Sequence, residues 1–364
     1  MAAKIVNYYA GGNTARGFYS LYDSNIEDLA KFFILKGGSG TGKSTIMKNI
    51  GGAFAEKGFE VEYWHCASNN NTIEGVKIPA IKVGIVNETV SQTIESKTIR
   101  DIVKCIDVSE AWDSTQIVKQ KEKLLLLSQQ ASEANQTAYK LFFEALKVHD
   151  EWEKIYIENM DFAKANECTE QLIKQLFGEN RKMGKSKVVH RFLGAATPKG
   201  AVDFVPNLTE GTPNRFLIKG RPGSGKSTIL KKLVTHAKDC GFDVEVYHCG
   251  FDPNSLDMVI VRELGFSIFD STAPHEYFPS RKGDKIIDMY ANLITPGTDE
   301  RYAKEIVGVS KRYKEKMQEA ISYLAKAKSF NSECEAIYNP AFHLDKLNHL
   351  IEELKMALFE KSSK

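Results

Sequence analysis

A glycine-rich loop that occurs twice constrains this chain more than any other feature. The first copy follows the apolar residues 32–35 and reads Gly37-Gly38-Ser39-Gly40-Thr41-Gly42-Lys43-Ser44-Thr45. The second copy follows the apolar residues 216–218 and reads Gly220-Arg221-Pro222-Gly223-Ser224-Gly225-Lys226-Ser227-Thr228. Each copy fits the pattern G-x-x-x-x-G-K-[ST] between a strand-like run and a helix-like run, and in that context the pattern predicts phosphate binding.

The residue types of the loop follow from the demands of a phosphate group. Glycines let backbone N–H groups converge on phosphate oxygens, and the N-terminus of the following helix adds positive potential. Lys226 is expected to reach the β- and γ-phosphates, and the Ser227 hydroxyl is expected to bind Mg²⁺. Lys43 and Ser44 hold the same places in the first loop. The pattern therefore predicts two nucleotide sites.

The repetition extends well beyond the loops. Lys226 follows Lys43 by 183 residues. At this offset, residues 59–66 and 242–249 are identical at five of eight positions. Towards the end of each copy the offset becomes 182, where Tyr156 matches Tyr338. Such self-similarity indicates a tandem duplication. We call residues 1–183 the first half and residues 184–364 the second half, and we expect each to form a phosphate-loop domain.

Each half has the pattern of an α/β fold followed by long helices. Helices are predicted at about 43–57 and 226–239, with Gly58 and Gly241 as their C-terminal caps. Strands are predicted near 59–66, 81–87, 242–249 and 264–270, so we expect a parallel sheet flanked by helices. Residues 112–177 contain neither Gly nor Pro. They predict a long helical hairpin at about 113–178, with a break near 159–161 and a counterpart at about 299–361.

Composition narrows the functional classes. Of 364 residues, 42% are hydrophobic and 26% are charged. The net charge of +2 argues against a strongly basic surface for nucleic acid, with a local basic patch as the alternative. No apolar run reaches 18 residues, and six scattered cysteines form no C-x-x-C pair. We therefore expect a cytoplasmic protein that neither spans a membrane nor binds nucleic acid. The apolar run 124–127 is interpreted as helix packing, with a membrane or partner surface as the alternative.

The two halves differ where a metal-binding acid is expected. In phosphate-loop enzymes a neighbouring strand commonly ends in a carboxylate that holds Mg²⁺. The second half supplies Asp270 after an apolar strand, whereas the first half has Asn87. Asp252 of the second half similarly faces Asn69. Asp252 is interpreted either as a catalytic base or as the start of an Asp-Pro turn.

These substitutions predict that the first loop binds nucleotide without turning it over. His275, which faces Gln92, is a further candidate for contact with the γ-phosphate or substrate, with a surface-loop role as the alternative. Neither the N-K-x-D nor the D-x-x-G motif of GTPases follows the loops, which favours adenine nucleotide.

The chain also resembles a bacterial family of tandem phosphate-loop proteins that are labelled ATPases or nucleotide kinases and have no established substrate. The likeness lies in residues 11–18, both loops, residues 255–257 and the segment 270–275, and it covers nearly the full length. It implies the phosphate-loop fold and ATP binding, but no particular reaction. The family's D-G-T-A-P-H-like segment is kept in the second half with Ser271 in place of Gly, and it is lost in the first half at residues 87–92.

Together these features predict a Mg²⁺-dependent ATP-binding protein. Lys226, Asp270 and Asp252 are its candidate catalytic residues, and Ser227, Asp270 and Ser44 are its candidate metal ligands. The phosphate contacts come from Gly37, Gly40, Gly42, Lys43, Ser44 and Thr45, and from Gly220, Gly223, Ser224, Gly225, Lys226, Ser227 and Thr228. Two alternatives remain open. One is a nucleotide or small-molecule kinase, and the other is a non-catalytic scaffold controlled by ATP that binds a protein partner.

Overall fold

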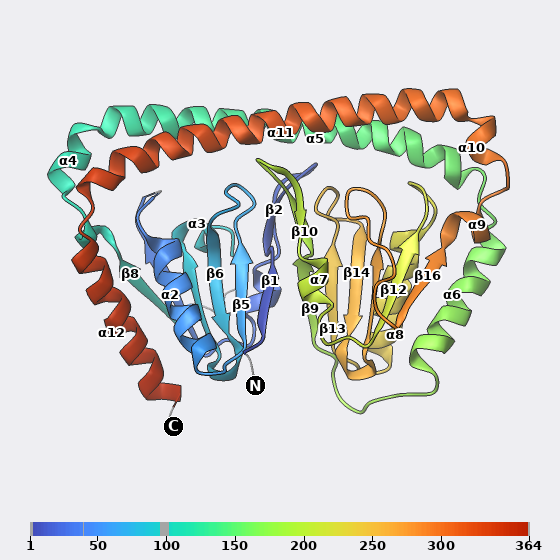
Figure 1. The fold of residues 1–364 in the computed structure, drawn as a ribbon, viewed down its shortest axis with the longest axis horizontal. Coiled ribbons are helices and arrows are strands. Elements are labelled where there is room, and N and C mark those ends of the chain that lie inside the picture. The colour runs from blue at the N-terminus through green and yellow to red at the C-terminus, as the bar shows by residue number, and fades with distance from the viewer. Residues whose placement is uncertain (1–2, 39, 95–101, 363–364) are drawn as a thin grey trace.

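The computed structural model describes residues 3–38, 40–94 and 102–362, so Ser39 of the first loop lies outside the described residues. Two six-stranded sheets, one from each half, stand side by side beneath a pair of long helices (Figure 1). The first sheet has the strand order β1 (Ile5–Tyr8), β5 (Val61–His65), β6 (Ile73–Ile78), β7 (Val83–Asn87), β4 (Lys31–Lys36) and β8 (Val103–Asp107). The second has the matching order β9 (Val188–Phe192), β13 (Val244–His248), β14 (Leu256–Val261), β15 (Phe266–Asp270), β12 (Asn214–Lys219) and β16 (Asp284–Asp288).

We expected each sheet to be parallel, but each contains one antiparallel strand. In each sheet five strands run in one direction, and the strand that the sequence did not predict, β6 or β14, runs against both of its neighbours. The reason is the length of the connections. Only the short 3₁₀ helices η1 (Pro79–Ile81) and η4 (Arg262–Leu264) join these strands to β7 and β15, and a parallel crossover needs a much longer link.

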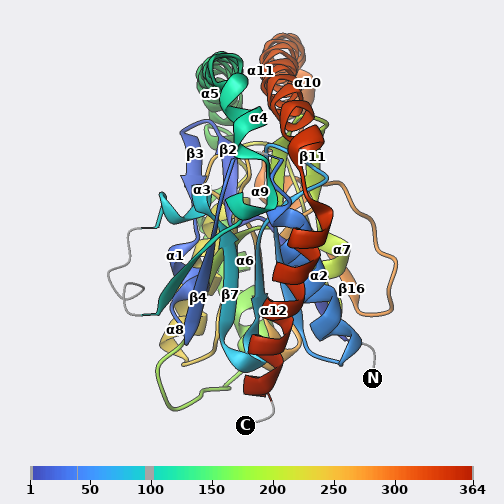
Figure 2. The same cartoon turned by 90° about the vertical axis from the view of Figure 1, so that its left-hand side faces the viewer.

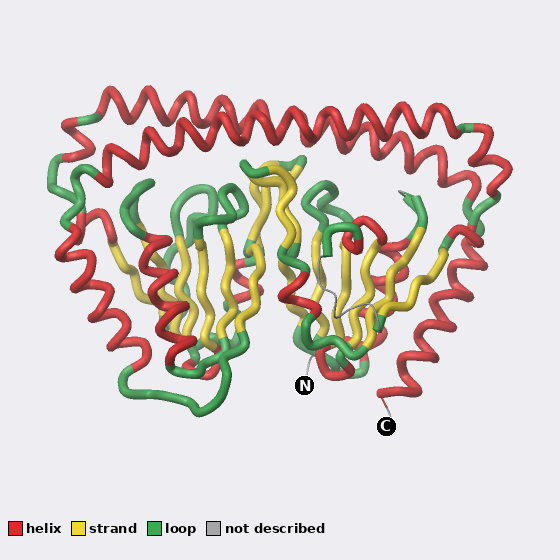
Figure 3. The backbone as a smooth tube through the Cα atoms, turned by 180° about the vertical axis from the view of Figure 1, so that it is seen from behind, coloured by secondary structure: helices red, strands yellow, loops and turns green. Residues whose placement is uncertain are grey.

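A smaller antiparallel sheet joins the halves at the centre of the molecule (Figure 3). It contains one hairpin from each half, in the order β11 (Gly200–Asp203), β10 (Gly194–Thr197), β2 (Gly11–Thr14) and β3 (Gly17–Ser20). Asn13 pairs with Ala196 across the join, and its side-chain amide donates a hydrogen bond to the Ala196 carbonyl at 3.1 Å. Each hairpin turn is thereby directed towards the opposite half.

Buried charge also connects the halves. Arg191 on β9 places Nη2 3.0 Å from both carboxylate oxygens of Glu62 on β5, and its Nε donates to Asn25 at 3.1 Å. Arg191 and Glu62 are both buried. Burial alone would raise the pKa of Glu62, but the charges of Arg191 and Lys77 hold that pKa below its usual value. The pair is therefore ionised and lies inside the interface.

The shorter helices cover the sheets and their connections. Their bounds are α1 (Asp23–Ile26), α2 (Lys43–Glu56), α3 (Glu88–Ser91), α4 (Ser114–Lys119), α7 (Val205–Leu208), α8 (Lys226–Asp239), α9 (Met289–Leu293) and α10 (Thr298–Arg301), with 3₁₀ turns η3 (Ser109–Ala111) and η5 (Asn339–Ala341). As predicted, α2 and α8 follow the glycine-rich loops, and Gly58 and Gly241 lie just beyond them with φ of 86° and 79°. Buried apolar side chains of α2 and α8 pack against the adjoining sheets.

The long helices do not form the predicted hairpins. The break near residues 159–161 separates α5 (Lys121–Ile157) from α6 (Phe162–Phe177), and its counterpart separates α11 (Ala303–Tyr338) from α12 (Leu344–Ser362). However, α5 pairs with α11 along the top of the molecule, as Figure 2 shows end-on. Small residues such as Ala138 and Ala320 allow the close approach, and Arg312 pairs with Glu151 at 2.6 Å across it.

The remaining long helices complete the cores of the opposite halves. Helix α6 packs on α8 of the second half, with Leu172 and Phe177 in its core. Helix α12 packs on α2 of the first half, with Leu347 and Ile351 in its core. The exchange follows from the span of α5 and α11, which at 1.5 Å per residue are about 55 Å long and carry the chain across the molecule.

Exposure of the apolar residues on α5 is uneven. Leu127 and Phe142 are buried, as expected for helix packing, whereas Leu125, Leu126 and Phe143 are exposed. Within the described part of the chain, no helix combines the length and apolarity needed to cross a bilayer.

Candidate functional site

The second glycine-rich loop joins β12 to α8 at the carboxyl edge of the sheet. Gly223 and Gly225 have φ of 74° and 85°, a left-handed backbone region that side chains disfavour. Gly225 is the N-cap of α8, and the buried Ser224 hydroxyl donates to the Arg221 carbonyl at 2.8 Å. Lys226 donates from Nζ to the same carbonyl at 2.9 Å. The loop therefore curls over the N-terminus of a 14-residue helix, as an anion site requires.

Two predicted residues from distant parts of the second half meet at this loop. Strand β15 lies parallel to β12, and their register sets Asp270 beside Ile218, two residues before the loop. Asp270 Oδ2 lies 3.6 Å from Lys226 Nζ, and Oδ1 accepts hydrogen bonds from the backbone and hydroxyl of Thr272 at 3.0 and 2.6 Å. Lys226 and Asp270 thus come together as the strand-end rule predicts.

The structure adds Asp257, which sequence reasoning did not select as a site residue. The antiparallel register of β14 against β15 pairs Met258 with Phe269, and the next residues along the two strands are Asp257 and Asp270. The charge of Asp270 acts on Asp257, as expected for neighbouring strand residues. The neighbouring Leu256 N–H donates to the Ser227 hydroxyl at 2.9 Å. Burial, reinforced by the charge of Asp270, raises the pKa of Asp257 to about 6. Its signal in the sequence is an acid at the start of an apolar run, and only the strand register shows its partner.

Asp252 is less free than the sequence suggested. Its Oδ1 lies 3.0 Å from Nε of Arg16, which comes from the β2–β3 turn of the first half. The same oxygen accepts from the Asn254 backbone N–H at 3.2 Å, as in an Asx turn. Asp252 therefore combines the turn role with an ion pair between the halves.

His275 is bound to a carboxylate at the edge of the second site. Its Nδ1 lies 2.7 Å from Asp203 Oδ2, and the Tyr277 hydroxyl donates to the other Asp203 oxygen at 2.6 Å. Burial opposes protonation of His275, but Asp203 and the charge of Asp257 together raise its pKa. His275 is thus held in place by Asp203 near the carboxylate pair, rather than being a free side chain on the loop surface.

The described part of the first loop shares two glycine conformations and a serine contact with the second loop, but its chemistry differs. Gly40 and Gly42 have φ of 77° and 79°, and Ser44 accepts from the Ile73 N–H at 3.1 Å as Ser227 does from Leu256. Lys43 donates to the Gly37 carbonyl at 2.6 Å and to the Thr41 hydroxyl at 3.0 Å. Burial lowers the pKa of Lys43 to about 8.

The acidic partner of the first loop is Glu88 rather than residue 87. Asn87 caps α3 by accepting from the Val90 N–H at 3.1 Å. Glu88, which sequence reasoning passed over, lies 3.5 Å from the Gly37 N–H, and its charge partly offsets the effect of burial on Lys43. The first site therefore has a carboxylate, but at a different position from Asp270.

Each loop is covered by a long helix of the opposite half. A Cβ atom on Gly223 would lie 2.9 Å from the Glu153 Cα of α5, and one on Gly40 would lie 2.9 Å from the Glu335 Cα of α11. Only glycine fits such an approach. At Gly38 the neighbour is instead the side chain of Tyr338. The helices therefore touch the loops at matching positions.

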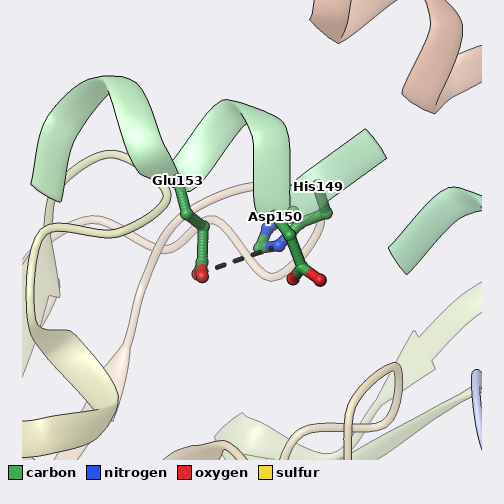
Figure 4. Close-up of side chains that lie close together, drawn as sticks. All are labelled: His149, Asp150 and Glu153. Carbon is green, nitrogen blue, oxygen red and sulfur yellow. Dashed lines mark ion pairs between the residues drawn. The ribbon is translucent and has the colours of Figure 1, made fainter. Parts of the chain in front are cut away.

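On α5 the glutamate belongs to a group of three polar residues, which Figure 4 shows in close-up. The ligand atoms of His149, Asp150 and Glu153 all lie within 4.8 Å of one another, and His149 Nδ1 is 3.7 Å from Glu153 Oε1. At the offset of 182 residues, α11 has Asn331 and Ser332 in place of the first two. The helix over the second loop therefore carries two ionisable side chains, His149 and Asp150, that the helix over the first loop lacks.

Comparison of this chain with family models, curated proteins and solved structures finds no match.

Proposed function

We propose that the chain is a Mg²⁺-dependent ATP-binding protein built from two tandem phosphate-loop NTPase units, with γ-phosphate hydrolysis or transfer at the second site. The observation that carries this is the meeting of Lys226, Ser227 and Asp270 at the N-terminus of α8. Asp270 comes from a separate strand, whereas Lys226 and Ser227 begin α8, and each of the three has the chemistry that the reaction needs.

The donor set suits a small divalent cation. Asp270, Asp257 and the Ser227 hydroxyl offer hard oxygen ligands, which Mg²⁺ prefers. Two carboxylates on opposing strands repel one another, and a cation would relieve that repulsion. Mg²⁺, when bound, would neutralise charge on the β- and γ-phosphate oxygens.

The protein's own groups account for binding and orientation. Backbone N–H groups of the loop and the positive end of α8 would hold the phosphates. Lys226 would exchange the Arg221 carbonyl for phosphate oxygens and stabilise the charge that develops on them. In the first site Lys43 and Ser44 would bind nucleotide, and Asn87 leaves the position of Asp270 uncharged, because the carboxylate of that site, Glu88, lies at a different position. That site is proposed to bind and regulate.

The kinase alternative loses its candidate base, because Asp252 is held by Arg16. We therefore place hydrolysis ahead of transfer to a second substrate. The scaffold alternative predicts nucleotide binding without turnover, so one experiment distinguishes the three.

The test measures binding of a fluorescent ATP analogue and phosphate release by the full chain. We expect two nucleotides per chain, one lost in Lys43→Ala and one in Lys226→Ala. Phosphate release should disappear in Lys226→Ala and persist in Lys43→Ala. Asp270→Asn, which gives the second site the residue of the first, should weaken Mg²⁺ dependence and turnover.

Three outcomes contradict the proposal in different ways. Absence of nucleotide binding to the wild-type chain would reject it entirely. Equal loss of turnover in both lysine variants would reject the division of roles. Turnover that starts only when a metabolite is added would establish a kinase.

A further inference from the structure

The second site is not complete within its own half. Helix α5 comes from the first half and lies directly on the glycine-rich loop, where the Glu153 main chain faces Gly223. Asp299 connects the end of this helix to the loop. It accepts a hydrogen bond from the Tyr156 hydroxyl of α5 and pairs with the Arg221 guanidinium of the loop, at 2.8 Å each. The side chains of α5 are therefore fixed relative to Lys226.

The carboxylates near Lys226 differ in how they are engaged. Asp270 is paired with Lys226, and Asp257 lies behind it on the next strand. Asp252 is paired with Arg16. Glu153 differs from all three, because it approaches the tip of the loop from the helix above rather than from the sheet.

The surroundings of Glu153 favour a carboxylate that exchanges protons. Burial and the nearby charge of Asp150 raise its pKa, while Lys226 and the Gly223 N–H partly oppose this. Burial lowers the pKa of His149, whose neutral ring faces the Glu153 carboxylate. A half-buried acid of raised pKa beside a neutral imidazole is a suitable proton acceptor.

The matching position over the first loop supports a specialised role. Glu335 occupies the place of Glu153, but Asn331 and Ser332 replace His149 and Asp150. The residues that tune the glutamate are thus present only over the loop that has Asp270.

We propose that the second site is composite, and that Glu153 of the first half holds and deprotonates the nucleophile that attacks the γ-phosphate there. This rests on the proposed function. A water molecule bound to the Glu153 carboxylate forms a bond from its oxygen to the γ-phosphorus as the bond to the β–γ bridging oxygen breaks. The water proton passes to Glu153, and ADP leaves with the electron pair. His149 acts as a positioning residue that orients the carboxylate.

The experiment compares Glu153→Gln with a control on the same helix. Glu151→Gln removes an exposed carboxylate two residues away, whose partner is Arg312 on α11. We expect Glu153→Gln to bind the fluorescent ATP analogue within about threefold of wild type and to lose about 10²-fold or more in single-turnover phosphate release, the usual contribution of a general base. Glu151→Gln should retain its turnover within about twofold, because an exposed pair contributes little.

The pH dependence separates a base from a structural contact. Wild-type turnover should rise with pH as Glu153 loses its proton, and Glu153→Gln should remove this part of the acid limb. The part that comes from Asp257, whose pKa is raised to about 6, should remain in the variant. His149→Asn introduces the residue that α11 has at the matching position, Asn331. It should shift the acid limb of the pH–rate profile while leaving nucleotide affinity unchanged. Glu153→Asp should recover part of the lost rate.

Several results would overturn the proposal. These are wild-type turnover in Glu153→Gln, an acid limb that the substitution leaves unchanged, and loss of nucleotide affinity equal to that of Lys226→Ala. Stoichiometric Mn²⁺ binding without nucleotide that Glu153→Gln abolishes would make the group a metal site instead. If Lys226→Ala abolishes turnover while Glu153→Gln leaves it unchanged, only this inference fails. If Lys226→Ala turns over normally, the proposed function itself fails.

Discussion

Replacing Arg191 by Met tests whether buried charge holds the two halves together. The substitution removes the guanidinium that lies 3.0 Å from both Glu62 oxygens, and it leaves that buried carboxylate with the Tyr8 hydroxyl at 2.7 Å and the charge of Lys77. Glu245, the second partner of Arg191 at 3.5 Å, keeps Arg262. The uncompensated group is therefore Glu62.

Removing one partner of a buried ion pair costs about 3–5 kcal/mol, so Arg191→Met should lower the free energy of unfolding by that amount. Lys187→Met is the matched control. Lys187 also pairs across the halves, with Asp28 at 2.8 Å, but its side chain is 47% exposed. Its loss should cost about 0–1 kcal/mol, because solvent screens such pairs.

Urea denaturation followed by tryptophan fluorescence measures both effects. Trp64 is fully buried, and its ring lies 6.4 Å from that of Tyr8, beside the ion pair. The double variant Arg191→Met with Glu62→Met should recover most of the loss, because it removes the uncompensated Glu62 charge, while Lys77 and Glu245 keep Asp28 and Arg262 as partners.

The pH dependence has a definite sign. The lowered pKa of Glu62 contributes stability above its unfolded pKa of about 4.3, and that stability is lost as pH falls through the folded pKa. The difference between wild type and Arg191→Met should therefore be full at pH 7 and shrink towards pH 4. A loss below about 1 kcal/mol at pH 7, or a double variant no more stable than Arg191→Met, would refute the reasoning.

Three further predictions concern the loops and the exchanged helices. Gly223→Ala should cost more stability than Gly211→Ala, because both have positive φ but only Gly223 has a helix against it; equal costs in urea denaturation would contradict this contact. Glu88→Gln should lower the pKa of Lys43 further below about 8, measured by NMR titration of the Lys43 side chain, and an unchanged titration would remove Glu88 from the first site. Leu347→Ala should cost about 2–5 kcal/mol and weaken nucleotide binding at the first loop, so an effect confined to the second half would be incompatible with the exchange.

Local patterns predicted the parts of the site that depend on local geometry. The spacing of Gly220, Gly225 and Lys226 specifies a strand, a turn and a helix within a dozen residues. Asp270 followed from the rule that parallel strands end at one edge, and the structure places it 3.6 Å from Lys226. The break between α5 and α6 followed from the residues at 159–161.

Other features depend on partners that the sequence does not specify. Asp257 could be identified as a site residue only from the structure, because the antiparallel register of β14 and β15 brings it next to Asp270. Periodicity shows which face of α6 is apolar, but the halves are copies and offer equivalent surfaces to it. No local signal distinguishes packing on α2 from packing on α8. Glu153 was missed for the same reason, since its role depends on which loop lies beneath α5.

The exchange of helices has a consequence for the order in which the protein can assemble during synthesis. The core of the first half contains Leu347, Ile351 and Leu354, which are synthesised after all the strands of both halves. The core of the second half takes Leu172 and Phe177 from a helix made before its own strands. Domains usually fold as they emerge, from the N-terminus onwards. Here the earlier-made core stays incomplete until helix α12 has been synthesised, whereas the later-made core can close as soon as its sheet exists.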